Sequence, residues 1–204
     1  KSEKDNYKGW VKTNTIGEKI KSTHKIRNVI SNVYIQPDIK SPLLTSLYLN
    51  SKVYLEQVNS YWYKVLIKNK VGFISIENIC QNYSYSIDWS KTALMFLNSP
   101  YLWGGKTYYG IDCSGLVQIA LESVGLLFPR NTSNQIRFKS KNVFDYEKIE
   151  KECLVFWDGH VGIMLDENNI LHSNAHHLCV KIENLNNASK RIGEIKAIKK
   201  VNLR

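Results

Sequence analysis

The sequence lacks the long apolar runs that would place a chain in a membrane. No stretch approaches the roughly 18 consecutive apolar residues that a membrane-spanning helix needs, and residues 1–6 have no apolar core of the signal-peptide kind. We therefore expect no membrane span. The numbering begins at Lys1 and not at a methionine, so a leader or a longer N-terminal region removed before Lys1 remains an alternative.

Cysteine is scarce, and its spacing excludes the common cysteine-based sites. Cys80, Cys113, Cys153 and Cys179 lie far apart, with no paired spacing of the kind that holds zinc. We expect no metal and no other cofactor. If one cysteine is a nucleophile, an odd number remains, which argues against a disulfide framework and for a reducing compartment. A cytoplasmic location is the expectation, with a secreted or periplasmic one as the alternative if a leader was removed.

Acidic residues are outnumbered by basic ones. The chain has 28 lysines and arginines against 18 aspartates and glutamates, a formal net charge of +10. Such a field suits nucleic acid, an anionic membrane or an acidic small substrate. The lysines are dispersed, and no zinc finger, glycine-rich phosphate loop or RNA-binding aromatic signature accompanies them. We therefore expect no nucleic-acid partner and favour an acidic substrate, with a merely solvated surface as the open alternative. The oligomeric state is not indicated.

The N-terminal part reads as all-β. Residues 27–79 contain about five short β-rich runs separated by turn-forming residues, which fits a small barrel. Residues 72–79 have an earlier counterpart in residues 9–16, with a glycine, an aromatic and an aliphatic residue in the same order. We therefore interpret residues 1–22 as the tail of a preceding unit, residues 23–80 as the barrel and residues 81–89 as a linker, and expect the native protein to continue before Lys1.

Residues 90–204 are predicted to form a second domain. Helices are expected from residue 87 to about residue 97 and from about residue 113 to residue 124, where Gly125 supplies a stop. Strands follow at residues 154–157, 160–165 and 170–174, the first two joined by an Asp-Gly hairpin turn. Helices followed by an antiparallel sheet predict an α+β domain.

Cys113 lies where a loop enters a helix, within residues 110–115. Its sulfur would face the positive end of the helix dipole, which favours thiolate over thiol. A small buried apolar cysteine is the alternative. That alternative fits Cys153 and Cys179, on their predicted strands, better than it fits Cys113.

A thiol nucleophile needs a base and a third group that orients the base. His160 begins a predicted strand, and alternation places His160, Gly162 and Met164 on the face opposite Val161. If the aliphatic face is the core, His160 points toward the helix of Cys113. His172, on the next strand, could then bond the far nitrogen of His160. A lone histidine is more often structural, so each assignment depends on the other.

An aromatic and glycine segment, residues 101–105, precedes the nucleophile. The hydroxyl of Tyr101 could join a backbone N–H in stabilising the oxyanion of a tetrahedral intermediate. Packing in the core is the alternative, and it fits Trp103 better than Tyr101.

Together these segments resemble the NlpC-type family of papain-like cell-wall endopeptidases. Residues 101–105, 112–117, 154–157 and 160–163 occur in the family's order and spacing, over roughly residues 90–182. The resemblance implies an α+β papain-like catalytic domain, Cys113 as nucleophile, His160 as base and His172 as orienting group. It also implies that the tyrosine of the family's Tyr-x-Trp-Gly-Gly motif is Tyr101.

A narrower resemblance is to the branch with N-terminal bacterial SH3-like domains that acts as γ-D-glutamyl-L-diamino-acid endopeptidases. Residues 38–42 and 171–177 look like that branch. It implies a small all-β SH3-like barrel before the catalytic domain, and Asp112 and Ser114 as ligands of the free amine of a terminal L-alanine. Asp112 as a simple helix cap is the alternative.

The implied reaction is hydrolysis of the γ-D-glutamyl-diaminopimelate bond of peptidoglycan stem peptides through a thioester. Peptides with a free amine are muropeptides released for recycling. The alternatives are a wall-degrading autolysin acting on intact peptidoglycan, a non-catalytic wall-binding protein, and an acyltransferase using the same acyl-enzyme step.

Overall fold

The computed structural model describes residues 2, 5, 7–17, 20–67, 69–143, 149–201 and 203. The chain forms two compact units. The smaller unit is Gly9–Ser84, and the larger unit combines Lys1–Lys8 with Tyr85–Arg204. Each unit has a hydrophobic core of its own.

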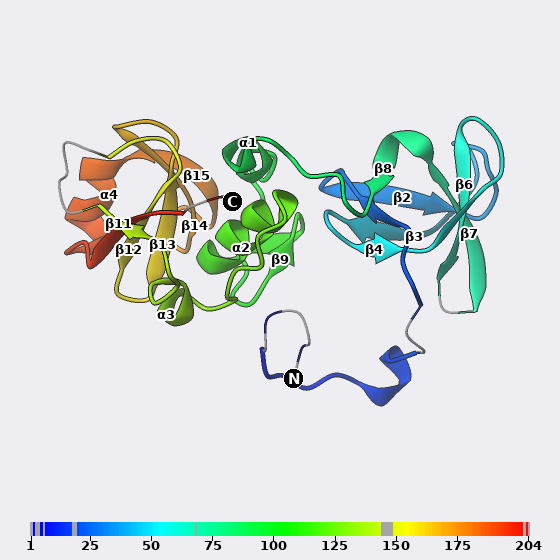
Figure 1. Cartoon of the computed structure of the whole chain (residues 1–204), viewed down its shortest axis with the longest axis horizontal. Helices are drawn as coiled ribbons and strands as arrows, with labels where there is room; N and C mark the ends of the chain where they lie inside the picture. Colours follow the sequence, from blue (N-terminus) through cyan, green and yellow to red (C-terminus); the bar gives the residue numbers. More distant parts are fainter. Residues whose placement is uncertain are drawn as a thin grey trace. The chain divides into compact units, whose positions relative to one another are not determined.

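The smaller unit is built from short antiparallel strands (Figure 1). Two short 3-10 turns accompany them, η1 (Thr13–Thr15) and η2 (Ile76–Asn78). The strands are β1 (His24–Ile26), β2 (Ile30–Tyr34), β3 (Leu43–Tyr48), β4 (Lys52–Val53), β5 (Leu55–Gln57), β6 (Trp62–Ile67), β7 (Lys70–Ser75) and β8 (Ile79–Gln81). Five of them form a sheet in the order β3-β2-β7-β6-β5, and three form another in the order β4-β1-β8.

The expected closed barrel is not what these strands form. Among the described residues the two sheets remain separate, and neither closes on itself. The chain changes sheet at Tyr54, because β4 before it pairs with β1 while β5 after it pairs with β6. Buried aliphatic side chains, among them Ile26, Val33, Val65 and Ile74, form the core of this unit. Sequence patterning indicated β-rich runs that overlap β2 and β4 to β7, but it missed β1, β3 and β8 and did not assign strands to sheets.

The two segments read as a repeat share one local feature. The turns η1 and η2 fall at the same aligned positions of residues 9–16 and 72–79. Only the second turn follows a strand, since none is described over residues 7–17. The domain boundaries and the preceding unit therefore stay predictions.

The larger unit contains a six-stranded antiparallel sheet in the order β11-β16-β12-β13-β14-β15. Its strands are β11 (Lys141–Asn142), β12 (Cys153–Trp157), β13 (His160–Met164), β14 (Asn169–Asn174), β15 (Cys179–Asn184) and β16 (Ala197–Lys200). The helices are α1 (Trp89–Leu94), α2 (Cys113–Ser123), α3 (Thr132–Gln135) and α4 (Leu185–Ile192). A small hairpin, β9 (Lys106–Thr107) with β10 (Gly110–Ile111), precedes α2.

Helices cover both faces of this sheet. In Figure 1 the yellow-to-orange strands lie between the green helix α2 and the orange helix α4. Met164 and Ile170 share a core cluster with Leu185 and Ala188 at the α4 side, while α2 packs against β13 and β14. Alternation along β13 predicted that one face of the strand would pack in the core. In the structure both faces are covered, since the residues from Val161 to Met164 are all buried.

Helix α2 forms where it was predicted. The side chain of Asp112 caps it by accepting a hydrogen bond from the backbone N–H of Gly115 at 2.7 Å. Gly125, with φ of +84°, follows its end. Every residue of α2 except Glu122 is buried, because the helix lies between α1 and the sheet. The first residue of α2 is thereby fixed in position.

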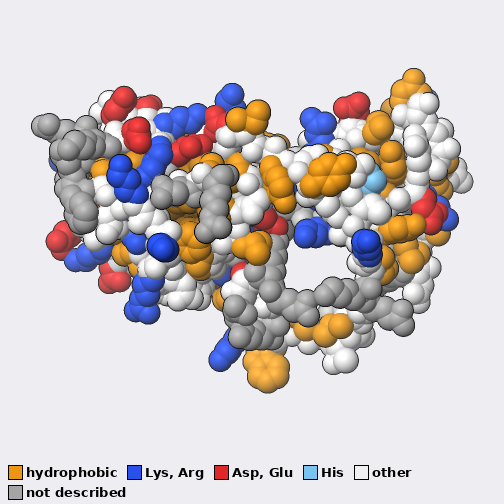
Figure 2. All heavy atoms as spheres, in the orientation of Figure 1, with side chains coloured by type: hydrophobic (Ala, Val, Ile, Leu, Met, Phe, Trp, Pro, Cys, Tyr) orange, Lys and Arg blue, Asp and Glu red, His pale blue; other side chains and the backbone are white. Residues whose placement is uncertain are grey.

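The helices among the described residues include none that is both long and apolar enough to span a membrane. On the face shown in Figure 2, lysine and arginine side chains are scattered among acidic and neutral ones. This dispersal agrees with the pattern in the sequence.

Candidate active site

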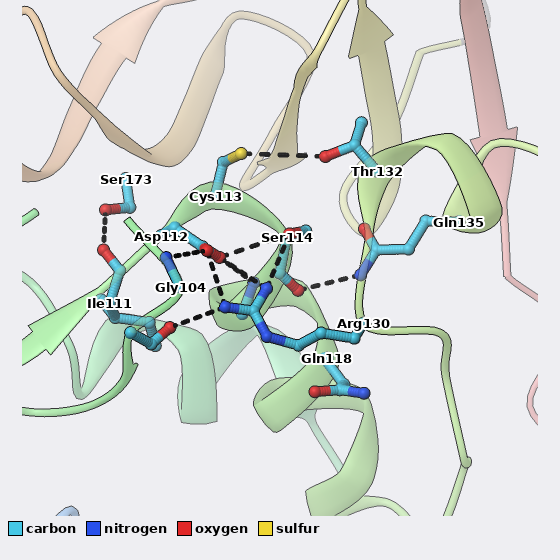
Figure 3. Close-up of polar contacts among 12 residues, drawn as sticks. Gly104, Ile111, Asp112, Cys113, Ser114, Gln118, Arg130, Thr132, Gln135 and Ser173 are labelled. Carbon is cyan, nitrogen blue, oxygen red and sulfur yellow. Dashed lines mark hydrogen bonds and ion pairs between the residues drawn. The ribbon is translucent and has the colours of Figure 1, made fainter. Parts of the chain in front are cut away.

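Cys113 is the first residue of α2, and its side chain is the predicted nucleophile. The residue is only 7% exposed. Its Sγ lies 3.9 Å from the hydroxyl oxygen of Thr132, the first residue of α3 (Figure 3). The sulfur also accepts hydrogen bonds from the backbone N–H groups of Val161 and Ser114. Val161 follows His160 directly, so the sulfur lies at the end of β13 where the predicted base begins the strand.

Burial has the largest effect on the pKa of this sulfur. Burial raises the pKa of the Cys113 thiol above its usual value, and the carboxylate of Asp112 raises it further. The Thr132 hydroxyl and the two backbone N–H groups act in the opposite direction. The resting group is therefore a neutral thiol and not the expected thiolate. It must lose its proton to a base during attack on a substrate.

The two predicted histidines are hydrogen-bonded to each other. Nε2 of His160 lies 2.9 Å from Nδ1 of His172, and Nε2 of His172 lies 3.1 Å from Oε2 of Glu183. A carboxylate can only accept, so His172 carries its proton on Nε2 and offers Nδ1 as acceptor. His160 then donates from Nε2. Its Nδ1 is left unprotonated and can receive the thiol proton.

Both imidazoles are neutral near neutral pH. Burial lowers the pKa of His160 to about 3, helped by the neighbouring His172 and Arg191. Burial lowers the pKa of His172 to about 4, helped by Arg191 and His177. A neutral thiol and a neutral imidazole are the protonation states that a general-base role of His160 would require.

Glu183 and Arg191 extend this chain, and the sequence did not identify them. In the β14–β15 pair His172 lies opposite Lys181, so Glu183 is its diagonal neighbour on the same face. Arg191, from α4, donates to the same carboxylate oxygen. Glu183 lies two positions from Lys181, the cross-strand partner of His172. It could be predicted as a partner of His172 only if the register of the β14–β15 pair were known.

Asp112 and Ser114, predicted to bind a substrate amine, lie together and share one partner. Nη1 of Arg130 donates to Oδ1 of Asp112 at 2.8 Å and to Oγ of Ser114 at 2.9 Å. Nη2 donates to Oδ2 of Asp112 at 2.6 Å and to the carbonyl oxygen of Gly105 at 3.2 Å (Figure 3). The guanidinium therefore connects the loop at Gly105 with the α2 cap residue Asp112 and with Ser114 in the first turn of α2. Arg130 was not predicted, because the loop around it has no periodic pattern that would place its side chain.

The carboxylate of Asp112 is saturated with donors. Besides Arg130, it accepts hydrogen bonds from the backbone N–H groups of Gly104 at 2.9 Å and Gly115 at 2.7 Å. Glycine is required at position 115, because a Cβ there would lie 2.6 Å from the carbonyl oxygen of Gly105. The helix-capping alternative for Asp112 is thus observed. An amine can reach this carboxylate only by replacing one of its present donors.

Tyr101 is half-buried beside the nucleophile. Burial raises the pKa of its hydroxyl, and negative charge on Cys113 and Asp112 raises it further. The hydroxyl therefore keeps its proton and can donate a hydrogen bond. Trp103 was expected in the core, but it is 83% exposed. It stands in a turn with Gly104, whose φ of +77° redirects the chain.

Strand β14 touches both halves of the site. His172 points to one face, toward the other histidine, and Ser173 points to the opposite face. The hydroxyl of Ser173 donates to the carbonyl oxygen of Ile111 at 2.6 Å, just before the cap and the nucleophile. One strand therefore positions the orienting histidine and the loop that delivers the sulfur.

Comparison with known proteins agrees with this geometry. Residues 98–192 match the model of the NlpC/P60 family. A "Dipeptidyl-peptidase 6" of Lysinibacillus sphaericus is 27% identical over 75% of this chain and 61% of its own length. A "Gamma-D-glutamyl-L-lysine dipeptidyl-peptidase" of Bacillus cereus is 29% identical over 76% of this chain and 50% of its own length. The chain thus spans about half to three fifths of these curated relatives.

Solved structures show the same fold. An NlpC/P60 family protein from Bacillus cereus superposes with a TM-score of 0.73 at 25% identity, covering 87% of this chain and 62% of that one. NlpC2 from Trichomonas vaginalis superposes with a TM-score of 0.53 at 16% identity, covering 90% of this chain and 74% of that one, a likeness of fold alone. With the matched residues 98–192 spanning Cys113, His160 and His172, this chain carries an NlpC/P60 domain of mixed α/β, papain-like fold.

Proposed function

We propose that this protein is a cysteine peptidase that hydrolyses the γ-D-glutamyl-diaminopimelate bond of peptidoglycan stem peptides. The observation that carries the proposal is the continuous chain from His160 through His172 to Glu183, which leaves Nδ1 of His160 unprotonated. The next residue, Val161, donates its backbone N–H to the sulfur of Cys113. NlpC/P60 family members are cysteine peptidases, and one relative is named for a γ-D-glutamyl-L-lysine bond. The positive charge of the chain favours a substrate rich in carboxylates.

The geometry supports a two-step acyl transfer. His160 Nδ1 takes the thiol proton while the sulfur of Cys113 attacks the γ-carbonyl carbon of D-glutamate. The oxyanion is stabilised by the backbone N–H of Cys113, at the start of α2, and by the Tyr101 hydroxyl. His160 then returns the proton to the leaving amine. A water molecule, deprotonated by His160, hydrolyses the thioester and regenerates the thiol.

Free-amine recognition is the more specific part of the proposal. Asp112 and Ser114 supply acceptors beside the nucleophile, and Arg130 occupies them in this structure. An ammonium group would have to replace the guanidinium at one Asp112 oxygen. Because an acylated amine has no charge to offer in exchange, it would leave the guanidinium in place and lose its own hydrogen bond to the carboxylate, worth about 1.5 to 3 kcal/mol for a charged group.

The identity of the smaller unit is a further part of the proposal. We propose that it is a bacterial SH3-like unit, supported by its antiparallel strands and by a superposition covering 87% of the chain. A substrate freed from glycan would be met in recycling, so a cytoplasmic location is part of the proposal. A secreted wall-degrading autolysin is the alternative.

The decisive experiment is mass spectrometry of defined peptides after incubation with the protein. L-Ala-γ-D-Glu-diaminopimelate should be cut at the γ-D-glutamyl bond. The peptide with L-lysine in place of diaminopimelate is tested in parallel. The wild type should cut the N-acetylated peptide at least about fivefold more slowly than the peptide with a free amine. In Asp112→Asn the difference between these two rates should be smaller. Equal cleavage of free and acetylated peptides would instead favour the autolysin. A transferred acyl group in the presence of an added amine would favour an acyltransferase. No product from any peptide would favour a wall-binding protein.

A further inference from the structure

Three potential metal ligands gather beside the histidine pair. One ligand atom each from His172 on β14, His177 in the turn after β14, and Glu183 on β15 lie within 4.8 Å of one another. We propose that these residues bind a divalent zinc-like cation. Two imidazole nitrogens and one carboxylate oxygen form a three-ligand set typical of zinc, which leaves a fourth position for water.

The ring of His177 is already in the state that a metal requires. Its Nδ1 lies 3.0 Å from Oδ1 of Asn174, which also accepts the backbone N–H of His177 at 2.8 Å. The backbone donor identifies that atom of Asn174 as the oxygen, so the ring carries its proton on Nδ1. The lone pair on Nε2 is therefore free. A histidine that donates its other N–H to an oxygen is the usual support of a metal ligand.

The cluster can contract to the distances of a zinc site. Ligand atoms about 2.0 to 2.2 Å from a tetrahedral ion lie roughly 3.3 to 3.6 Å apart. Spacings of up to 4.8 Å must therefore close by at most about 1.5 Å. His177 follows two exposed turn residues, Ala175 and His176. His172 and Glu183 are held by the β14–β15 ladder. The movable ligand is therefore the one in the turn.

Arg191 opposes the cation. Its guanidinium donates to the same Glu183 oxygen that accepts from His172, and its positive charge lies beside the proposed site. The ion must displace or tolerate this arginine, which reduces its affinity. Removing the charge of Arg191 should therefore strengthen metal binding. If Glu183 had only a structural role, the same change would merely weaken the contact between Glu183 and residue 191.

Occupancy of the site would reverse the tautomers of the histidine pair. A cation on Nε2 of His172 moves the proton of that ring to Nδ1. His172 then donates to Nε2 of His160, and the proton of His160 moves to Nδ1, the atom that must be unprotonated to accept the thiol proton. No proton is gained or lost, and the base is inactive. The binding part of this inference stands alone; the inhibition part rests on the proposed function.

Binding is tested by calorimetric titration of the full chain with ZnCl₂ in the Cys113→Ala background, where the thiol cannot take the metal. We expect one site, weakened by roughly tenfold or more in His177→Ala. His176→Ala, the adjacent exposed histidine, is the matched control and should bind as before. Arg191→Gln should bind more tightly. ¹⁵N NMR of the imidazoles should show the His172 proton moving from Nε2 to Nδ1.

Absence of binding in Cys113→Ala, or equal binding after His177→Ala or His177→Gln, would overturn the site. Inhibition is measured on the peptide substrate relative to each variant's own zinc-free rate. His177→Ala should resist zinc and His176→Ala should not. Equal inhibition of the wild type and His177→Ala would place the inhibitory ion elsewhere and reject the switch. A chain that binds zinc as expected but never cleaves peptide would contradict the proposed function and leave the metal site intact.

Discussion

Oε2 of Glu183 accepts a hydrogen bond from Nε2 of His172 over 3.1 Å. This contact fixes the tautomers of both histidines. With its proton on Nε2, His172 can only accept a hydrogen bond at Nδ1, so Nε2 of His160 must be the donor. Glu183 is a positioning residue for the base although it does not contact the nucleophile. The protein thereby selects one of the two tautomers of a neutral imidazole without charging it.

Glu183→Gln should lower kcat by roughly ten- to a hundredfold with little change in KM, the usual effect of losing the partner that orients a functional histidine. The amide can present either a donor or an acceptor to His172, so the tautomer is no longer fixed. ¹⁵N NMR should show a mixed population on that ring. Glu167→Gln, on the exposed turn before β14, is the control and should behave as the wild type. An unchanged kcat would remove Glu183 from the site.

Cys113→Ala should abolish hydrolysis, a loss of at least about a thousandfold, while the thermal midpoint stays near the wild-type value. The side chain starts a capped helix and supplies little packing. Cys179→Ala is the matched control in the same unit and should retain activity. Turnover by Cys113→Ala, or inactivation that follows alkylation of another cysteine, would assign the nucleophile elsewhere.

His160→Ala should reduce the rate more than His172→Ala, because the first removes the proton acceptor and the second only its orientation. Rates are compared at saturating peptide over a range of pH. Equal losses would mean that the two rings share the role of base. A pH-rate profile unaffected by His160→Ala would exclude that residue.

Arg130→Met should destabilise the fold by about 3 to 5 kcal/mol, because it leaves the buried carboxylate of Asp112 without its ion-pair partner. Chemical denaturation measures the loss. The double variant Arg130→Met/Asp112→Asn should recover part of it, since no unpaired charge remains. Arg137→Met, exposed in the same loop region, should change stability by less than about 0.5 kcal/mol. A similar loss of stability in Arg130→Met and Arg137→Met would contradict the importance of the ion pair between Arg130 and Asp112.

Stability should fall as pH falls from 7 to 5. The pKa values of His160 and His172 are lowered, mainly by burial, to about 3 and about 4. Over this window the unfolded chain takes up protons near its ordinary histidine pKa while the native rings do not, which favours unfolding by about 1 to 2 kcal/mol per histidine at pH 5. His160→Gln/His172→Gln should flatten the dependence, and His176→Gln should not. A midpoint that rises with acid would refute the assignment.

The helix that begins at Cys113 and the strands that carry His160 and His172 were predictable from turn chemistry, capping and periodicity, all local properties. Arg130, His177 and Glu183 were not, because their proximity to the site depends on loop conformation and on the β14–β15 register. The expectation that no metal binds was drawn from cysteine spacing alone. It could not take account of ligands brought together by strand pairing.

The misplaced expectations have equally specific causes. Trp103 looked like a core residue, but the glycine turn beside it sends the ring into solvent. Residues 52–58 form one of the β-rich runs of the sequence, but the break at Tyr54 places β4 and β5 in different sheets. The helix dipole alone favoured a thiolate, and that argument did not include burial, which raises the pKa of Cys113.

Neighbouring residues of β14 face opposite ways, His172 toward the other histidine and Ser173 toward the carbonyl of Ile111. The strand therefore acts as a spacer whose length is fixed by covalent bonds. Thermal motion that displaces it carries the orienting histidine and the nucleophile loop together, so their separation should vary less than either position does. An insertion of one residue between His172 and Ser173 would turn the following side chains to the wrong faces, so this step of the backbone should not tolerate a change of length.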